Sequence, residues 1–425
     1  MPRISIPHRY RSARTVLIVF SALTALTLHL FGYSYWPSWI DNARSQSCVV
    51  PEPADLAPGS RRPRIALVET SGTHDEVAAA VVYAFGSQSH VDLSYFSSRQ
   101  RFGIGRILDG FELASHYGKV QSLYAFTQAA RQCPPPDIVV SITCELDLAS
   151  IWTAAALRHL VGNGVTQLFC VIHHGDRWNL EYGPNAELAQ QWAASGKVNF
   201  LGLSEHTVNY LINDTRKSWD HEITAYAFPP VFPVDQGPLR DDISLVMQGN
   251  YDPTKRDYEA IFEGLSDAIS RARKPPEPRD VSLHLVGHGI QKPDVPDELK
   301  VSVVFDTGKS YLDFYMLLSQ AFAVIPAFAT DNYYTVKASS TIPAALIASA
   351  PLVASEELLS KYTYVNPDSV WLSKTGEHEI ETVQRIINDW DEFLKKRALT
   401  RIRTTEILAQ NRANVKTWIK EMLKD

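Results

Sequence analysis

The sequence predicts an α/β protein of two doubly wound domains, each a parallel sheet with helices packed on both faces. Short apolar runs alternate with helical stretches from residue 64 onward, which is typical of parallel sheets. A proline-rich stretch at residues 228–237 interrupts this alternation and separates an earlier α/β series from a later one. The length of 425 residues also favours two domains.

In the first series, an apolar strand at residues 65–70 leads through a polar turn into a helix at residues 75–85. Thr73 and Glu76 fit a capping box at the start of that helix. Further strands of the same sheet are predicted at residues 90–96, 137–143, 167–173 and 198–203. Ligands of such a sheet bind at the carboxyl ends of its strands, so the loops there are the first place to look for a site.

The second series ends in the most informative segment of the chain. Its earlier elements are strands at residues 243–248, 282–286 and 301–305 and helices at residues 257–273 and 311–320. The last unit is a strand at residues 321–328, a polar Lys-Ala-Ser-Ser-Thr loop at residues 337–341, an Ala-rich helix and a strand at residues 352–354. This is the order of a nucleotide-binding βαβ unit, in which the helix N-terminus faces an anion.

Residues 377–424 are predicted to be helical, with apolar side chains at the i, i+3, i+4, i+7 spacing of an amphipathic face. Because a monomeric protein avoids exposing such a face, we expect this segment to pack across both domains. Truncation after Gly376 is therefore expected to cause aggregation.

The N-terminus predicts a membrane anchor. Four arginines precede residues 15–36, and residues 15–35 contain no Lys, Arg, Asp or Glu, a span suited to one bilayer pass of about 20 residues. The arginines place residues 1–14 in the cytosol and the rest of the chain in the lumen. Residues 37–63 then form a stem. A cleaved signal peptide is the alternative, although the apolar run is long for one and no clear cleavage site follows.

A lumenal location permits disulfides and glycosylation. The four cysteines, Cys48, Cys133, Cys144 and Cys170, can pair in three ways, and the sequence does not choose among them. Asn213 opens a glycosylation sequon. The net charge of −6 does not favour binding to nucleic acid, which is typical of basic domains.

Three local sequences resemble elements of the GT-B fold, the two-domain Rossmann-like architecture of nucleotide-sugar glycosyltransferases. Residues 248–256 are similar to the glycine loop after the first strand of the second domain, followed by basic residues. Residues 285–289 are similar to the strand and glycine near the donor base. Residues 344–355 resemble the helix and strand that close the donor site. The likeness extends from residue 64 to the C-terminus, and the anchored chain as a whole resembles fungal type II Golgi glycosyltransferases.

The resemblance implies an acceptor domain at residues 64–232, a nucleotide-sugar domain at residues 233–376 and C-terminal helices at residues 377–425. It also implies transfer of a sugar to a glycan or other acceptor in the Golgi or ER lumen. The nucleotide-sugar is then a co-substrate, and neither a tightly bound cofactor nor a metal is expected. The implied donor-binding residues are Gly249, Asn250, Lys255, Arg256, His288, Lys337, Ser339, Ser340 and Thr341.

The chain departs from the retaining members of this fold at two positions. Those enzymes carry two glutamates eight residues apart, and here the corresponding residues are Val336 and Ala344. A pyrophosphate can still bind through Lys337 and nearby hydroxyl groups. The missing glutamates motivate an alternative function, a degenerate sugar- or nucleotide-binding Golgi protein without turnover.

Candidate catalytic residues follow the strands of the first domain. His173 and His174 come directly after a buried strand, and a neutral imidazole accepts a proton near neutral pH. Glu69 ends the first strand and can accept a hydrogen bond from an acceptor hydroxyl. The corresponding structural interpretations are packed or solvated histidines and a glutamate that caps a helix or forms a salt bridge. The candidate acceptor-binding residues at this edge are Gly72, Thr73, His74 and Asp176.

Glu145 and Asp147 resemble the metal-binding acidic pair of the other glycosyltransferase fold, GT-A. That fold would require one continuous domain and a divalent metal such as Mn²⁺. The second α/β series from residue 243 argues against it.

Lys255 and Arg256 are expected to begin a helix after an N-cap at Thr254 and to bind the donor diphosphate. Positive side chains at a helix N-terminus cost about 0.3–1 kcal/mol, a penalty that a bound diphosphate removes. Arg256→Ala is therefore expected to weaken donor binding without lowering stability. A pair of solvated surface cations is the alternative.

Overall fold

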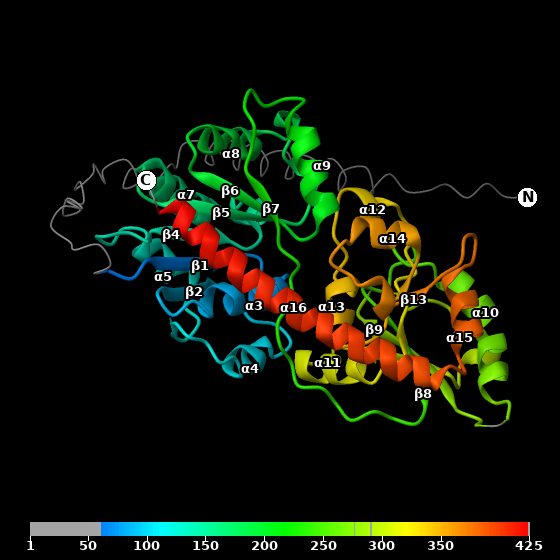
Figure 1. Ribbon diagram of the computed structural model, residues 1–425. Helices are drawn as coiled ribbons and strands as arrows, with labels where there is room; N and C mark the ends of the chain where they lie inside the picture. The colour runs from blue at the N-terminus through cyan, green and yellow to red at the C-terminus, as the bar shows by residue number, and fades with distance from the viewer. Residues whose placement is uncertain (1–60, 276, 290, 424–425) are drawn as a thin grey trace, which may run out of the picture. The chain divides into compact units, whose positions relative to one another are not determined.

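The computed structural model of the protein describes residues 61–275, 277–289 and 291–423. These residues form an α/β protein with two parallel sheets, and the compact unit Gly59–Asp425 contains both (Figure 1). The predicted anchor at residues 15–36 and nearly all of the stem lie outside the described residues. None of the described helices has both the length and the apolar character needed to cross a membrane.

The first sheet has the order β3-β2-β1-β4-β5-β6-β7, and every neighbouring pair is parallel. Its strands are β1 (Arg64–Glu69), β2 (Asp92–Ser97), β3 (His116–Tyr117), β4 (Ile138–Ser141), β5 (Gln167–Ile172), β6 (Val198–Gly202) and β7 (Ala225–Ala227). Strands β1, β4 and β5 are buried along almost their whole length. They are apolar runs because helices cover both faces of the sheet.

The helices of this half are α3 (Asp75–Gly86), α4 (Ile104–Asp109), α5 (Leu123–Ala129), α6 (Cys144–Asp147), α7 (Ile151–Gly162), α8 (Pro184–Ala194) and α9 (Glu205–Thr215). Ser122 and Ser150 cap α5 and α7 by accepting a backbone N–H. The predicted capping box at Thr73 does not form, since the residue before α3 is His74 and the Thr73 hydroxyl contacts Ser71.

The second sheet has the order β10-β9-β8-β11 and is also parallel. Its strands are β8 (Ile243–Gln248), β9 (Val281–Gly287), β10 (Val303–Thr307) and β11 (Ala323–Val324), and a small sheet pairs β12 (Val353–Ala354) with β13 (Trp371–Leu372). The helices are α10 (Tyr258–Ala272), α11 (Tyr311–Ser319), α12 (Asn332–Thr335), α13 (Thr341–Ile347), α14 (Glu356–Lys361), α15 (Glu379–Ile386) and α16 (Trp390–Met422).

Two element boundaries of this half differ from the sequence prediction. Strand β11 ends well before residue 328, because Pro326 has no N–H to donate and Ala327 adopts a positive φ of 45°. Helix α10 begins at Tyr258, and its N-cap is Asp257, whose side chain accepts the Ala260 N–H at 3.1 Å. Thr254 is therefore not the cap.

One hydrophobic cluster includes residues of both halves, from Ile65 on β1 to Val246 on β8 and Trp418 on α16. The proline-rich segment between the halves belongs to it, because Phe228 and Phe232 are fully buried. This segment therefore packs into the core instead of lying in solvent.

Helix α16 holds this arrangement in place by contacting elements of both halves. It packs against α3 and α13, and in Figure 1 it is the long red helix. Thr404 donates to the Leu346 carbonyl at 2.7 Å, and Asn411 donates to the Pro229 carbonyl of the proline-rich segment at 2.8 Å. Trp418 stacks on Tyr226 with ring centroids 4.7 Å apart.

Replacing Trp418 with alanine is expected to lower the free energy of unfolding by about 3–5 kcal/mol, the range for a buried aromatic side chain. Ile402 lies on the same helix but is 56% exposed, so Ile402→Ala is a matched control with an expected change below about 0.5 kcal/mol. Denaturant unfolding followed by circular dichroism measures both variants. Equally small effects would show that the packing of α16 contributes little to stability.

Candidate functional site

Residues of both halves line a cleft of about 530 Å³. This volume lies within the range of small-molecule sites. Its walls come from loops at the carboxyl ends of β1 and β5 in the first sheet and of β8, β9 and β10 in the second. Further lining comes from the start of α3, the loop after β2, helix α11, and the segment around α12 and the start of α13. Parallel α/β sheets bind ligands at this edge.

The structure brings most of the predicted site residues together in this cleft. Those that line it are Thr73, His74, His173, His174, Gly249, Asn250, Lys255, Arg256, His288, Lys337, Ser339 and Ser340. Those that do not line it are Glu69, Gly72, Asp176 and Thr341. Asn213 is exposed on α9.

Positive charge predominates in the lining although the whole chain carries a net charge of −6. Five cationic side chains line the cleft, against the two carboxylates of Glu76 and Asp306. The cations are Arg101, Lys255, Arg256, Lys309 and Lys337. This local excess is suited to an anionic ligand.

Two histidines stack at the edge of the first sheet. The rings of His74 and His173 have centroids 3.7 Å apart and an interplanar angle of 26°. Burial, two neighbouring histidines and Arg101 hold the pKa of His74 well below its usual range. His74 is therefore neutral at physiological pH.

Glu69 is connected to His74 by two hydrogen bonds that share the Thr143 hydroxyl. Glu69 is fully buried and accepts hydrogen bonds from the Ser71 hydroxyl, the Gly72 N–H and the Thr143 hydroxyl. Because the single hydroxyl hydrogen of Thr143 is donated to Glu69, its oxygen accepts from His74 Nδ1, 3.1 Å away. This leaves Nε2 of His74 without a hydrogen.

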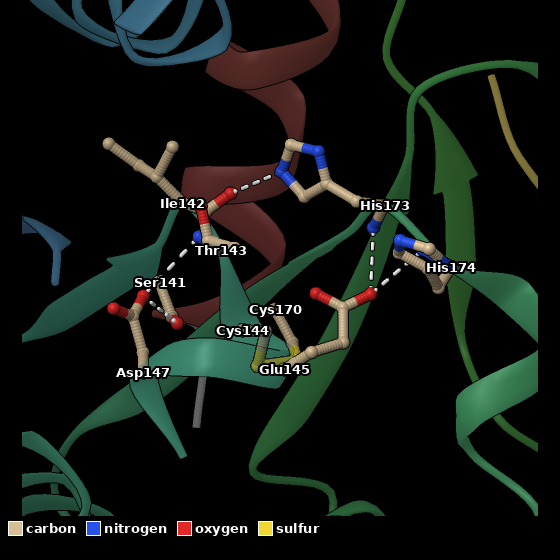
Figure 2. Close-up of a disulfide and its surroundings, with 9 residues drawn as sticks. All are labelled: Ser141, Ile142, Thr143, Cys144, Glu145, Asp147, Cys170, His173 and His174. Atoms are coloured by element: carbon tan, nitrogen blue, oxygen red, sulfur yellow. Dashed lines mark hydrogen bonds between the residues drawn. A yellow bond between two sulfur atoms is a disulfide. The ribbon is translucent and has the colours of Figure 1, made fainter. Parts of the chain in front are cut away.

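His173 has the opposite tautomer. Its Nε2 lies 2.9 Å from the Ile142 carbonyl, which only accepts, so Nε2 carries the hydrogen and Nδ1 has the lone pair. The backbone N–H groups of His173 and His174 both donate to Glu145 Oε1, at 2.8 and 2.9 Å (Figure 2). One carboxylate therefore fixes the backbone of both His173 and His174.

Glu145 and Asp147 support loops and do not form a metal pair. The side chain of Asp147 is fully buried and accepts from Thr70 N–H and the Ser141 hydroxyl (Figure 2 shows the latter). No group of His, Cys, Asp and Glu in the described part of the chain is arranged to hold a metal ion. With two separate parallel sheets, the GT-A alternative is wrong.

A disulfide joins Cys144, next to Glu145, to Cys170 on β5 (Figure 2). This is one of the pairings that the sequence left open. The disulfide links helix α6 to strand β5, which is followed by His173 and His174. It therefore holds Glu145 close to the backbone N–H groups of these two histidines.

On the second sheet, two glycines allow a close approach of backbone to backbone. A Cβ on Gly287 would lie 1.8 Å from the Gly249 carbonyl oxygen, so no other residue fits there. Gly249 itself has a φ of +141°. The turn brings the backbone of β8 and β9 together at the cleft.

Arg256 stabilises this turn. Arg256 as a whole residue is 5% exposed, and its guanidinium donates to the carbonyls of Gln248 and Lys255 and to the Thr341 hydroxyl, at 2.9–3.2 Å. It also lies over the rings of Phe328 and Tyr333. Arg256 and Thr341 are therefore structural supports of the wall, while Lys255 is 45% exposed and pairs with Asp252 at 2.9 Å.

Lys337 lies where the two halves touch. Its backbone forms an isolated bridge with His174, and its carbonyl faces His206 Nε2 at 3.0 Å. Gly175 N–H donates to the neighbouring Val336 carbonyl at 2.9 Å. These contacts place the Lys337 side chain at the cleft beside the histidines.

The sequence interpretation missed several lining residues. Arg101 and Phe102 come from the loop after β2, Glu76 from the first turn of α3, and Tyr311 from the start of α11. Tyr311 donates to Glu76 across the halves at 3.0 Å. Burial raises the pKa of Glu76. The rule that ligands bind at carboxyl ends of strands would have selected Arg101, but Glu76 was interpreted only as a capping residue.

Arg256→Ala is expected to lower the free energy of unfolding by about 2–4 kcal/mol, because it removes the hydrogen bonds that the buried guanidinium donates and its contacts with two aromatic rings. This corrects the expectation of unchanged stability. Lys255→Ala is the matched control, since that side chain is half exposed and its single ion pair contributes less than about 1 kcal/mol. Urea denaturation compares the two, and equal stabilities would contradict the structural role of Arg256.

A pH effect is expected from His174, whose pKa burial, Arg177, Lys337 and His173 lower to about 4. In the unfolded chain it binds a proton near pH 6.5. Its contribution to stability is therefore complete above pH 6.5 and is lost as the pH falls toward 4. The side chain is 27% exposed, so we expect a loss of about 1 kcal/mol.

The comparison of wild type with His174→Gln isolates this effect, measured as unfolding free energy at pH 7 and pH 4.5. The two proteins are compared because other groups also make the free energy of unfolding depend on pH. Burial raises the pKa of Asp75 and of Asp147 to about 7, so their contribution to the stability of the protein falls as the pH rises. The same pH dependence in both proteins would contradict the low pKa of His174.

No protein-family model matches the chain, and no curated protein sequence matches it. Solved structures resemble it in fold. Anabaena HepE in complex with UDP-glucose is similar with a TM-score of 0.55 over 84% of this chain and 99% of that chain, at 13% identity. Sucrose-phosphate synthase from Thermosynechococcus elongatus is similar with a TM-score of 0.54 over 85% and 99%, at 12% identity. With its two facing parallel-sheet halves, the chain has the GT-B fold of nucleotide-sugar glycosyltransferases.

Proposed function

We propose that the protein is a glycosyltransferase that moves a sugar from a nucleotide-sugar to a glycan or other hydroxyl acceptor. The observation that carries this proposal is the cleft itself, which is lined by an excess of cations and by the stacked rings of His74 and His173. The GT-B fold supports it, and one structural neighbour was solved with UDP-glucose.

The donor diphosphate binds on the cationic side of the cleft. Lys337 and Lys255 provide charge, and the hydroxyl of exposed Ser340 is a further donor. Hydrogen bonds between cations and phosphate oxygens are the strong ones in proteins. As the bond from the sugar C1 to the phosphate oxygen breaks, these groups stabilise the charge on the leaving diphosphate.

The acceptor binds on the side of the first sheet, where His74 is the base. Nε2 of His74 takes the proton of the acceptor hydroxyl while the new glycosidic bond forms at C1. The low pKa keeps the ring neutral, and the Glu69–Thr143 hydrogen bonds keep the hydrogen on Nδ1. In this mechanism Glu69 is a positioning residue and not the catalytic group that its place in the sequence suggested.

The second candidate is a binding protein without turnover. The observation that favours it is the absence of carboxylates at Val336 and Ala344, where retaining members of the fold carry glutamates. A nucleotide-binding protein without turnover would bind the donor as the enzyme does, so only the appearance of a product distinguishes these two candidates.

We also propose that the protein is a single-pass type II membrane protein of the Golgi or ER, with the cleft in the lumen. The uncharged segment at residues 15–35, preceded by four arginines, is the basis of this proposal. The Cys144–Cys170 disulfide favours an oxidising compartment. Exposed Asn213 is the proposed glycosylation site.

Activity is tested by screening nucleotide-sugars for nucleotide release with the purified chain, and then comparing His74→Asn. The asparagine amide keeps a donor toward Thr143 but removes the base, so kcat is expected to fall by roughly 10²–10⁴ with donor affinity unchanged. His159→Asn on the exposed surface of α7 is the control. Donor binding without product across a broad panel would instead support the noncatalytic candidate.

A further inference from the structure

A chain of hydrogen bonds runs along the second sheet and ends at the cleft. Ser282 and His284 lie two residues apart on β9 and so share one face of the sheet. Ser282 Oγ is 3.0 Å from His284 Nε2, and His284 Nδ1 is 2.7 Å from Asp306 Oδ2 on the neighbouring strand β10. Asp306 Oδ1 is in turn 2.9 Å from Lys309 Nζ.

The four residues differ in their access to the cleft. Asp306 and Lys309 line it, whereas Ser282 and His284 do not. The order serine, histidine, aspartate is that of a hydrolase triad, but the hydroxyl here is at the end away from the cleft. The arrangement therefore directs the aspartate and lysine toward a ligand and does not present a nucleophile.

Proton positions follow from the acceptor character of the carboxylate. Asp306 can only accept, so His284 Nδ1 carries a hydrogen and Nε2 contacts the Ser282 hydroxyl, which can donate or accept. The side chains of His284 and Asp306 are 14% and 11% exposed, and that of Lys309 is 31% exposed. Asp306 is thus held from both sides, and it holds the ammonium group of Lys309 at the cleft.

We propose that Lys309 binds the diphosphate of the donor and that His284 is a positioning residue that acts through Asp306. This inference rests on the proposed function, since it takes the donor to carry a diphosphate. When the ammonium group moves from the carboxylate to a phosphate oxygen, Asp306 keeps its hydrogen bond from His284. A buried carboxylate is then not left unpaired, which lowers the cost of releasing Lys309 to the ligand.

The first test is a double-mutant cycle on the affinity for UDP and for inorganic pyrophosphate, measured by calorimetry. Lys309→Met is expected to weaken both by roughly 10- to 100-fold. His284→Leu is expected to weaken them by about three- to tenfold, and the double variant should bind no worse than Lys309→Met alone. Independent, additive effects would overturn the relay.

His284→Asn serves as the conservative variant, because its amide nitrogen occupies the place of Nδ1 and still donates to Asp306. It is expected to bind UDP within about twofold of wild type, which a purely structural loss at this position would not allow. Weak binding by His284→Asn together with a native melting temperature would overturn the positioning role.

A second measurement is independent of any nucleotide. Limited acetylation followed by mass spectrometry compares the reactivity of Lys309 with that of Lys300, an exposed lysine paired with Asp297. The Lys309-to-Lys300 ratio is expected to change at least twofold in His284→Leu and to stay at the wild-type value in His284→Asn. An unchanged ratio in His284→Leu overturns the relay. If wild type binds neither UDP nor pyrophosphate, the diphosphate role and the proposed function fail, while the acetylation ratio still decides the positioning role.

Discussion

The cleft depends on how the first sheet satisfies the backbone N–H groups of the loops at its carboxyl edge. Three carboxylates do this: Glu69 accepts from Gly72, Asp147 from Thr70, and Glu145 from the two histidines. A buried N–H without a partner would cost about 1–3 kcal/mol. These hydrogen bonds therefore favour the loop conformation that brings the imidazole rings of His74 and His173 together.

Because these three carboxylates bind backbone groups and do not line the cleft, they also affect the balance of charge in its lining. Glu69, Glu145 and Asp147 do not line it, so the cations of the lining face only two carboxylates there. Burial, neighbouring histidines and nearby cations lower the pKa of His74 and of His174, which favours their neutral forms. One wall is thus suited to an anion and the other to a neutral hydroxyl compound, a division of roles that follows from burial and pairing.

Hydrophobic periodicity and the turn residues between elements were enough to predict the two parallel sheets and the histidines after β5, and the fold resemblance added the glycine turn at Gly249. Local patterns could not reveal contacts between distant segments. Arg256 was predicted from the sequence to bind a diphosphate, with a solvated surface cation as the alternative, yet it is buried and donates to Gln248 and Thr341 in the folded chain. Likewise, Glu69 has a catalytic position in sequence, but its partners come from residues that lie up to 74 positions away.

The two positions where the fold resemblance expects glutamates have packing roles in this chain. Ala344 is 5% exposed and lines the cleft, and Val336 is 9% exposed with its carbonyl bonded to Gly175 N–H. A sugar at this wall meets apolar surface instead of a carboxylate. The carboxylates of this lining are Glu76 and Asp306, which belong to opposite halves. If the protein binds a nucleotide-sugar as proposed, a sugar whose hydroxyl groups donate to both carboxylates contacts both halves at once.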